Sequence, residues 1–111
     1  MNKHTTMVIE LIGSIPAGKV CSYGQLASFA AVPGGARAVA RILHSCTGKH
    51  SLPWWRVVRS SGEIALPEDA GGAEQRERLL AEGVEFQRNG FVNLRLCGCT
   101  EQDFPTLTLT E

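Results

Sequence analysis

The stretch SYGQLASFAAVPGGARAVARILHS, residues 22–45, decides the fold. Ser22 is a typical helix N-cap, and the apolar residues after it recur at helical spacing, so we predict a helix over residues 23–31. The Val-Pro-Gly-Gly sequence at 32–35 ends that helix sharply, and a second helix follows over 36–45. Two short helices joined by a tight glycine turn, the second carrying basic residues, are typical of a helix-turn-helix motif.

The same spacing rules predict further helices and strands on both sides of this motif. Residues 4–14 are predicted to form an amphipathic helix, and residues 51–65 an extended segment. A further helix over 73–82 is expected to stop at a glycine. Two short strands, 84–86 and 91–96, flank an Asn-Gly pair and are predicted to form a hairpin.

These elements define a fold class that is mostly α. The expected architecture is a winged helix-turn-helix-like domain with short β-strands. A chain of 111 residues is long enough for one modest core but not for two. We therefore predict a single DNA-binding domain over residues 1–97, followed by a loose C-terminal tail over 98–111.

The remaining composition is that of an ordinary soluble domain. No signal-peptide pattern opens the chain, and its apolar runs are too short to span a bilayer. The four cysteines do not have the spacing of a disulfide framework, which favours reduced thiols and a cytoplasmic location, in a bacterial cytosol or nucleoid. The Cys97-Gly-Cys99 pair lacks two further ligands at suitable spacing, so neither a metal nor a cofactor is predicted. A monomer is expected.

The charges are segregated although the net charge is zero. There is no Asp or Glu from Leu11 to Gly62, a segment that holds six Lys and Arg residues. From Glu63 to Glu111, ten acidic side chains accompany four arginines. An acid-free basic segment is what a polyanion-binding face requires, because a carboxylate nearby would oppose each phosphate contact. The pattern favours DNA or RNA as a partner over a neutral small molecule.

Four motifs carry a resemblance to a known family. In chain order they are VCSYGQLA at 20–27, ARAV at 36–39, LPWWRVV at 52–58 and SG at 61–62. With this order and spacing, residues from about Ile12 to Phe86 resemble the C-terminal domain of O6-alkylguanine-DNA alkyltransferases. Those enzymes carry Pro-Cys-His-Arg at the active site, whereas this chain has Pro53-Trp54-Trp55-Arg56. Tryptophan at the cysteine position is a mark of the alkyltransferase-like proteins.

The substitution removes the chemistry that the family performs. Dealkylation requires a thiolate that is activated by a histidine and attacks the alkyl carbon. Trp54 stands at the cysteine position and has no nucleophile, and Trp55 stands at the histidine position, where an indole N–H can only donate. Glu82 matches the carboxylate that orients the histidine in the enzymes, and Arg56 matches a structural arginine. The resemblance therefore implies no catalytic residue and no enzyme.

The resemblance also implies a binding apparatus. Arg37 would enter the minor groove and replace the flipped nucleotide, while Tyr23 would rotate the 3′ phosphate and contact the base. Small residues such as Ala36 let the helix approach the groove closely. The full predicted DNA-binding set is Arg37, Tyr23, Ser22, Gln25, Ala36 and Arg41. The predicted lesion pocket is Trp54, Tyr23, Val58, Ser61 and Gly62, with Trp54 as an aromatic wall and Trp55 in the core.

The resemblance thus implies a DNA damage sensor without enzymatic activity. It would bind O6-alkylguanine in duplex DNA through the minor groove, flip the base, and hand the lesion to the recognition proteins of nucleotide excision repair. Two alternatives stay open. One is an active alkyltransferase that uses another cysteine, such as Cys46, and the other is a sequence-specific winged-helix regulator.

Overall fold

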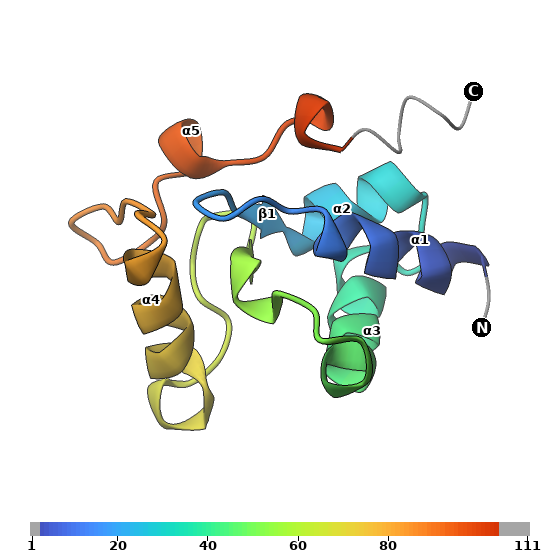
Figure 1. The fold of residues 1–111 in the computed structure, drawn as a ribbon, viewed down its shortest axis with the longest axis horizontal. Helices are drawn as coiled ribbons and strands as arrows, with labels where there is room; N and C mark the ends of the chain where they lie inside the picture. The colour runs from blue at the N-terminus through green and yellow to red at the C-terminus, as the bar shows by residue number, and fades with distance from the viewer. Residues whose placement is uncertain (1–2, 105–111) are drawn as a thin grey trace.

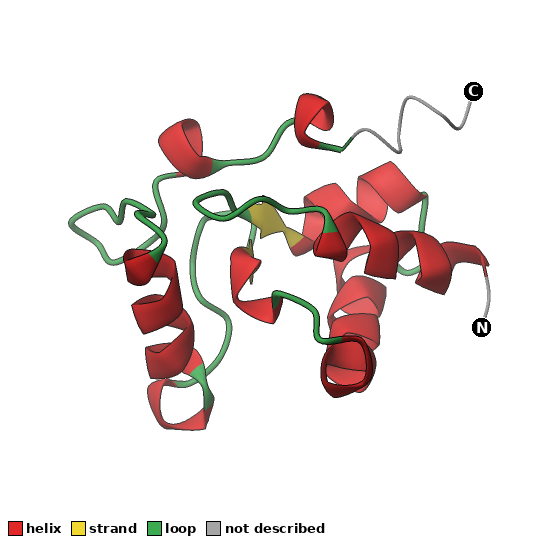
Figure 2. Ribbon diagram, viewed as in Figure 1, coloured by secondary structure: helices red, strands yellow, loops and turns green. Residues whose placement is uncertain are grey.

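The computed structural model describes residues 3–104, and for residues 46–50 it describes the backbone alone. Helices dominate the fold, with one pair of short strands near the centre (Figures 1 and 2). The α-helices are α1 (Lys3–Gly13), α2 (Tyr23–Ala30), α3 (Gly35–His50), α4 (Gly72–Ala81) and α5 (Leu94–Cys97). The 3-10 helices are η1 (Trp54–Arg56), η2 (Glu68–Ala70) and η3 (Glu101–Asp103). The strands are β1 (Cys21–Ser22) and β2 (Val57–Val58).

Helices α2 and α3 form the predicted helix-turn-helix. Ser22 caps α2 in a capping box: its hydroxyl accepts from the Gln25 N–H at 3.0 Å, and the Gln25 side chain accepts from the Ser22 N–H at 3.4 Å. Ala31 ends the helix with φ of 51°, and the axis turns through 99° into α3. The mostly helical, winged helix-turn-helix-like fold class is confirmed, and α3 runs beyond the predicted end at Ser45.

The two strands join segments that are far apart in the sequence. β1 pairs with β2 in parallel, with Cys21 opposite Val57 and Ser22 opposite Val58. All four residues are buried. This short sheet places η1, which directly precedes β2, beside the start of α2 (Figure 1).

The buried apolar residues form two clusters. The first lies between α1, α2 and α3 and includes Leu11, Leu26 and Val39, all with no exposed surface. The second lies under α4 and the segments after it, with Val58 and Leu79 at its centre. The β1–β2 sheet contributes to both clusters, because Val57 belongs to the first and Val58 to the second. Within residues 3–104, no single helix is long and apolar enough to cross a membrane. Helix α2 and the first part of α3 together have the length and composition of a span, but they are bent by 99°.

The structure corrects two predicted β segments. Residues 51–65 are not extended throughout, because Trp54–Arg56 form η1 and only Val57–Val58 form a strand. The predicted hairpin is reduced to a single antiparallel bridge between Phe86 and Val92. Residues 94–97 are helical instead, because the Asn93 side chain accepts from the Arg95 N–H and caps α5.

The predicted loose tail is also corrected for the part that the structure describes. Gly98 forms a parallel bridge with Val20. Cys99 is 5% exposed and Phe104 is fully buried, with its ring 5.4 Å from that of Phe29. Residues 98–104 therefore belong to the core, and residues 105–111 lie outside the described residues.

Candidate nucleic-acid interface

A cavity of about 900 Å³ opens between α3, η1 and α4. Its size falls in the range of pockets that enclose small organic ligands. The wall on the helix-turn-helix side consists of Tyr23, Ala36, Arg37, Ala40, Leu43 and His44. The remaining wall consists of Trp54, Arg59, Ala65, Leu66, Ala70, Gly71, Glu74 and Gln75.

Two aromatic side chains line this cavity from different segments. Tyr23 comes from the first turn of α2, and Trp54 opens η1; both are half-buried. The Trp54 ring meets that of Trp55 edge to face, with 6.0 Å between ring centroids. Burial raises the pKa of the Tyr23 hydroxyl, and the positive charge of Arg59 offsets part of that effect. At neutral pH Tyr23 is therefore a protonated hydrogen-bond donor and not a nucleophile.

The solvent-facing side of α3 is basic. Arg37, Arg41 and His44 are exposed along this side of the helix, while Val39 is buried on the other side. Arg37 and His44 line the cavity, and Arg59 approaches it from the segment after β2. Arg41 lies on the same basic side but outside the cavity wall. The predicted DNA-binding residues Arg37, Arg41, Tyr23 and Ala36 thus lie on or beside one surface.

Two other predicted DNA contacts are used inside the protein. Ser22 is 8% exposed and its hydroxyl caps α2. The Gln25 amide donates to the Cys99 carbonyl at 2.6 Å, and its oxygen accepts from the Cys21 thiol at 3.3 Å. These side chains hold the start of α2 and the C-terminal segment, and a DNA contact by Ser22 or Gln25 stays a prediction.

Three predicted pocket residues lie outside the cavity wall. Val58 is fully buried in the second core cluster. Gly62 is buried with φ of +93°, and a Cβ there would lie 2.4 Å from the Val92 carbonyl oxygen, so only glycine fits this turn. Ser61 is exposed, and its hydroxyl accepts from the Glu63 N–H. From this segment, Arg59, Ala65 and Leu66 line the cavity instead.

The sequence analysis missed the wall that α4 contributes. Gly72 lets the preceding loop approach the start of α4, because a Cβ there would lie 2.5 Å from the Leu66 carbonyl oxygen. Gln75, 2% exposed, donates to the backbone carbonyls of Trp55 at 3.1 Å and Val57 at 2.9 Å. A buried side-chain amide needs hydrogen-bond partners, and Gln75 finds them in the backbone of η1 and β2. The Gly71-Gly72 pair was the one sequence signal for this close approach.

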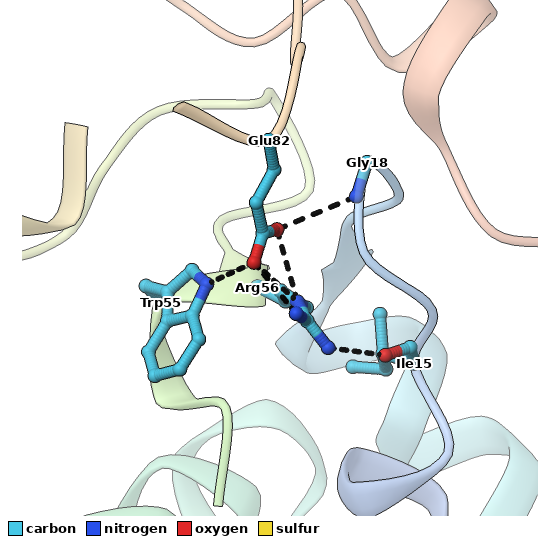
Figure 3. A network of polar contacts seen from close by, with 5 residues as sticks. All are labelled: Ile15, Gly18, Trp55, Arg56 and Glu82. Atoms are coloured by element: carbon cyan, nitrogen blue, oxygen red, sulfur yellow. Dashed lines mark hydrogen bonds and ion pairs between the residues drawn. The ribbon is translucent and has the colours of Figure 1, made fainter. Parts of the chain in front are cut away.

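A polar network fixes Trp55 and Arg56 of η1 (Figure 3). The Glu82 carboxylate accepts from the Trp55 indole N–H at 2.9 Å and pairs with the Arg56 guanidinium at 2.6 Å. It also accepts from the Gly18 N–H at 3.3 Å, and Arg56 donates in addition to the Ile15 carbonyl at 2.7 Å. Burial works to raise the pKa of Glu82, but the hydrogen bonds from Arg56 and Trp55 outweigh it and hold that pKa below its usual value.

Trp55 is half-buried at the edge of the second core cluster. The guanidinium carbons of Arg56 and Arg78 lie 5.3 Å and 4.6 Å from its ring centroid. Such cation–π contacts, together with the indole hydrogen bond, hold the ring in one orientation. Trp55 therefore has a structural role, whereas the adjacent Trp54 lines the cavity.

The cysteines whose side chains are described do not line the cavity. Cys21, Cys97 and Cys99 are all buried. A hydrogen bond with Cys99, together with burial, raises the pKa of the Cys21 thiol. Cys46 lies among the residues whose side chains are not described. Within residues 3–104, the described side chains include no group of three or more His, Cys, Asp or Glu that could hold a metal ion.

Comparison with known proteins gives a consistent result. Residues 3–84 match the family described as the DNA-binding domain of 6-O-methylguanine DNA methyltransferase. The chain is 37% identical over 95 residues to a DNA base-flipping protein of Vibrio parahaemolyticus, which covers 86% of this chain and 94% of the relative. It is 33% identical over 97 residues to alkyltransferase-like protein 1 of Schizosaccharomyces pombe, which covers 86% and 90% of the two chains.

The fold comparison agrees with the sequence comparison. The crystal structure of S. pombe Atl1 in complex with damaged DNA containing O6-carboxymethylguanine matches with a TM-score of 0.75 at 32% identity. The match covers 90% of this chain and 97% of that one. The chain therefore belongs to the family of the 6-O-methylguanine DNA methyltransferase DNA-binding domain and, within it, to the alkyltransferase-like proteins.

Proposed function

We propose that this protein is a non-enzymatic sensor of O6-alkylguanine in duplex DNA. One observation carries the proposal: an aromatic side chain, Trp54, lines a cavity beside the basic side of α3. Relatives named as base-flipping proteins, and the S. pombe relative bound to damaged DNA, support the same reading.

In the proposed complex, α3 lies against the minor groove. Ala36 and Ala40 are small, so the helix can approach a narrow groove closely. Arg37 lies at the mouth of the cavity and is exposed, which suits a side chain that fills the space of an extruded nucleotide. Arg41 and Arg59 add positive charge for the phosphates on either side. Unstacking a base costs a few kcal/mol, which these contacts must offset.

The flipped base then occupies the cavity. The indole of Trp54 offers an aromatic surface to the base, a contact worth about 1–3 kcal/mol in nucleic-acid complexes. Tyr23, which is protonated, can donate a hydrogen bond to an acceptor on the base edge. Leu66 and Leu43 give the cavity apolar surface for the alkyl group.

Several features argue that no alkyl transfer follows. Trp54 and Trp55 occupy the positions of the family's cysteine and histidine. Glu82 is already engaged by Arg56 and Trp55, so it cannot activate a nucleophile. Three of the four cysteines are buried away from the cavity wall. A bound lesion would therefore persist in a stable complex. In this proposal the protein binds DNA as a monomer, in the cytosol or nucleoid, and hands the lesion to nucleotide excision repair.

The proposal is tested with duplex DNA that carries radiolabelled O6-methylguanine. After incubation and denaturation, the label is expected to remain entirely on the DNA. A native gel of the same mixture is expected to show a complex that unlabelled lesion duplex displaces. Label bound covalently to the protein would mean that a cysteine is alkylated, and the sensor proposal would be rejected in favour of an enzyme.

A further inference from the structure

A second hollow lies across α4 from the cavity, and we call it the acidic groove. Its volume is about 430 Å³. Helix α4 lies between the two spaces: Glu74 and Gln75 line the cavity, Ala73, Glu77 and Leu80 line the acidic groove, and Leu66 before the helix lines both. In Figure 1, α4 stands apart from the basic helix α3.

The floor of the acidic groove is apolar and partly open to solvent. Leu66 is 39% exposed and Leu80 is 52% exposed, and these are two of the three large apolar side chains that are exposed in the described part of the chain. Ile64 and Phe91 extend the same floor. Apolar side chains gathered in one hollow mark interaction sites more often than scattered ones do.

The edges of the acidic groove carry unpaired negative charge. Glu63, Glu68 and Glu77 line it and are exposed. Among residues 3–104, the ion pairs are Arg56–Glu82 and Arg78–Glu74, so none of these three carboxylates is neutralised by one. Arg76 also lines the groove, with its guanidinium carbon 5.1 Å from the ring centroid of Phe86. This charge repels phosphate and excludes the groove as a DNA contact.

We propose that the acidic groove is a docking site for a basic, amphipathic segment of a protein partner. An apolar side chain of that segment would pack on Leu80 and Phe91, and its Lys or Arg side chains would meet Glu68 and Glu77. Charged rims around an apolar centre give both specificity and a fast encounter. Because α4 lies between the acidic groove and the cavity, a partner can occupy the groove while DNA occupies the basic side of α3. This simultaneous occupancy rests on the proposed function, whereas the groove itself does not.

The test uses the full chain and a defined probe. The probe is a synthetic amphipathic helical peptide with leucines on one face and arginines beside them. A scrambled peptide of the same composition serves as the control for charge alone. The peptides are titrated into isotope-labelled protein by NMR, with and without duplex DNA that contains O6-methylguanine. We expect saturable shifts at Ala73, Glu77, Leu80 and Phe91, and the same shifts in the lesion complex.

Variants then locate the site. The double variant Glu68→Lys with Glu77→Lys is expected to weaken peptide binding by about tenfold or more, because juxtaposed like charges cost upwards of about 1.4 kcal/mol. Leu80→Gln should weaken it without a change of charge, and Glu10→Lys on α1 should leave it unchanged. Both groove variants should bind the lesion duplex as the unmodified protein does. Equal binding of the scrambled peptide, shifts on α3 or at a self-association surface, or no binding would each overturn the proposal and leave the lesion-sensor function standing.

Discussion

Replacing Glu82 by Gln tests the network that fixes η1. The change keeps the shape of the side chain but removes the charge that Arg56 meets at 2.6 Å. It also places an amide N–H₂ among three donors, the Trp55 indole, the Arg56 guanidinium and the Gly18 N–H. At least one donor is then left without an acceptor in a region where both ion-pair partners are 16% exposed.

The size of the effect follows from this burial. Breaking a fully buried ion pair by removing one partner costs about 3–5 kcal/mol. Since both side chains keep a little solvent contact, we expect about 2–3 kcal/mol for Glu82→Gln. For a domain of this size, that is a fall in Tm on the order of 10 °C. The matched control is Glu74→Gln, which breaks the exposed Arg78–Glu74 pair, with 46% and 56% exposure, and should cost only about 0.5 kcal/mol.

The pH dependence gives a sharper check. The folded protein holds the pKa of Glu82 below its usual value. The stabilisation from this carboxylate is therefore fully present above the unfolded pKa, about 4.3, and is lost as the pH falls through the lower folded pKa. The difference in unfolding free energy between the unmodified protein and Glu82→Gln, from urea titrations, should be constant near neutral pH and shrink below about pH 4. A difference that stays constant through acid pH, or a cost at neutral pH no larger than that of Glu74→Gln, would refute the reasoning.

Three further changes test the cavity and the core. Trp54→Ala should weaken binding to an O6-methylguanine duplex by about 10- to 100-fold in fluorescence anisotropy, with little effect on undamaged DNA, because the aromatic contact is made only by the flipped base. Arg37→Ala should reduce the preference for the lesion more than it reduces general DNA binding, whereas Arg41→Ala, outside the cavity wall, should weaken both duplexes alike; equal losses for Arg37→Ala would contradict its role. Phe104→Ala should cost about 3–5 kcal/mol in urea unfolding because Phe104 is fully buried, and a cost below about 1 kcal/mol would mean that the C-terminal segment is not part of the core.

The parts of the fold that could be predicted are those fixed by local signals. The start of α2 follows from Ser22 and Gln25, which form a capping box within four residues. The parallel pairing of Cys21 with Val57 could not be read from the sequence, because it joins two-residue strands that are far apart along the chain. The hairpin prediction failed where Asn93, a strong N-cap, started a helical turn instead of continuing a strand.

The part of the candidate site that could be predicted is the part formed by residues of the motifs. Tyr23, Arg37 and Trp54 line one cavity although they come from three separate segments. Val58 was misplaced because both residues of β2 are buried, so the strand has no side that faces the cavity. The wall that α4 contributes, including Gln75, was not predicted, because no local sequence pattern indicates which side of a helix contacts a distant loop.

The structure gives Ser22 and Gln25 a role inside the protein that the motifs did not predict. Both are polar side chains in a motif with a DNA-binding resemblance, which favours an external contact. In the structure, the free N–H groups at the start of α2 and the carbonyl of Cys99 require partners, and these two side chains supply them. These internal hydrogen bonds are a role that the DNA-binding resemblance does not predict.

The central claim is that the protein recognises O6-alkylguanine and holds it without chemistry. The most direct test is a titration of two labelled duplexes, identical except for a single O6-methylguanine, at physiological salt. The account predicts clearly tighter binding to the lesion duplex and full recovery of the intact lesion after the protein is removed. Equal affinity for the two duplexes would contradict it, as would recovery of unmodified guanine from the lesion duplex.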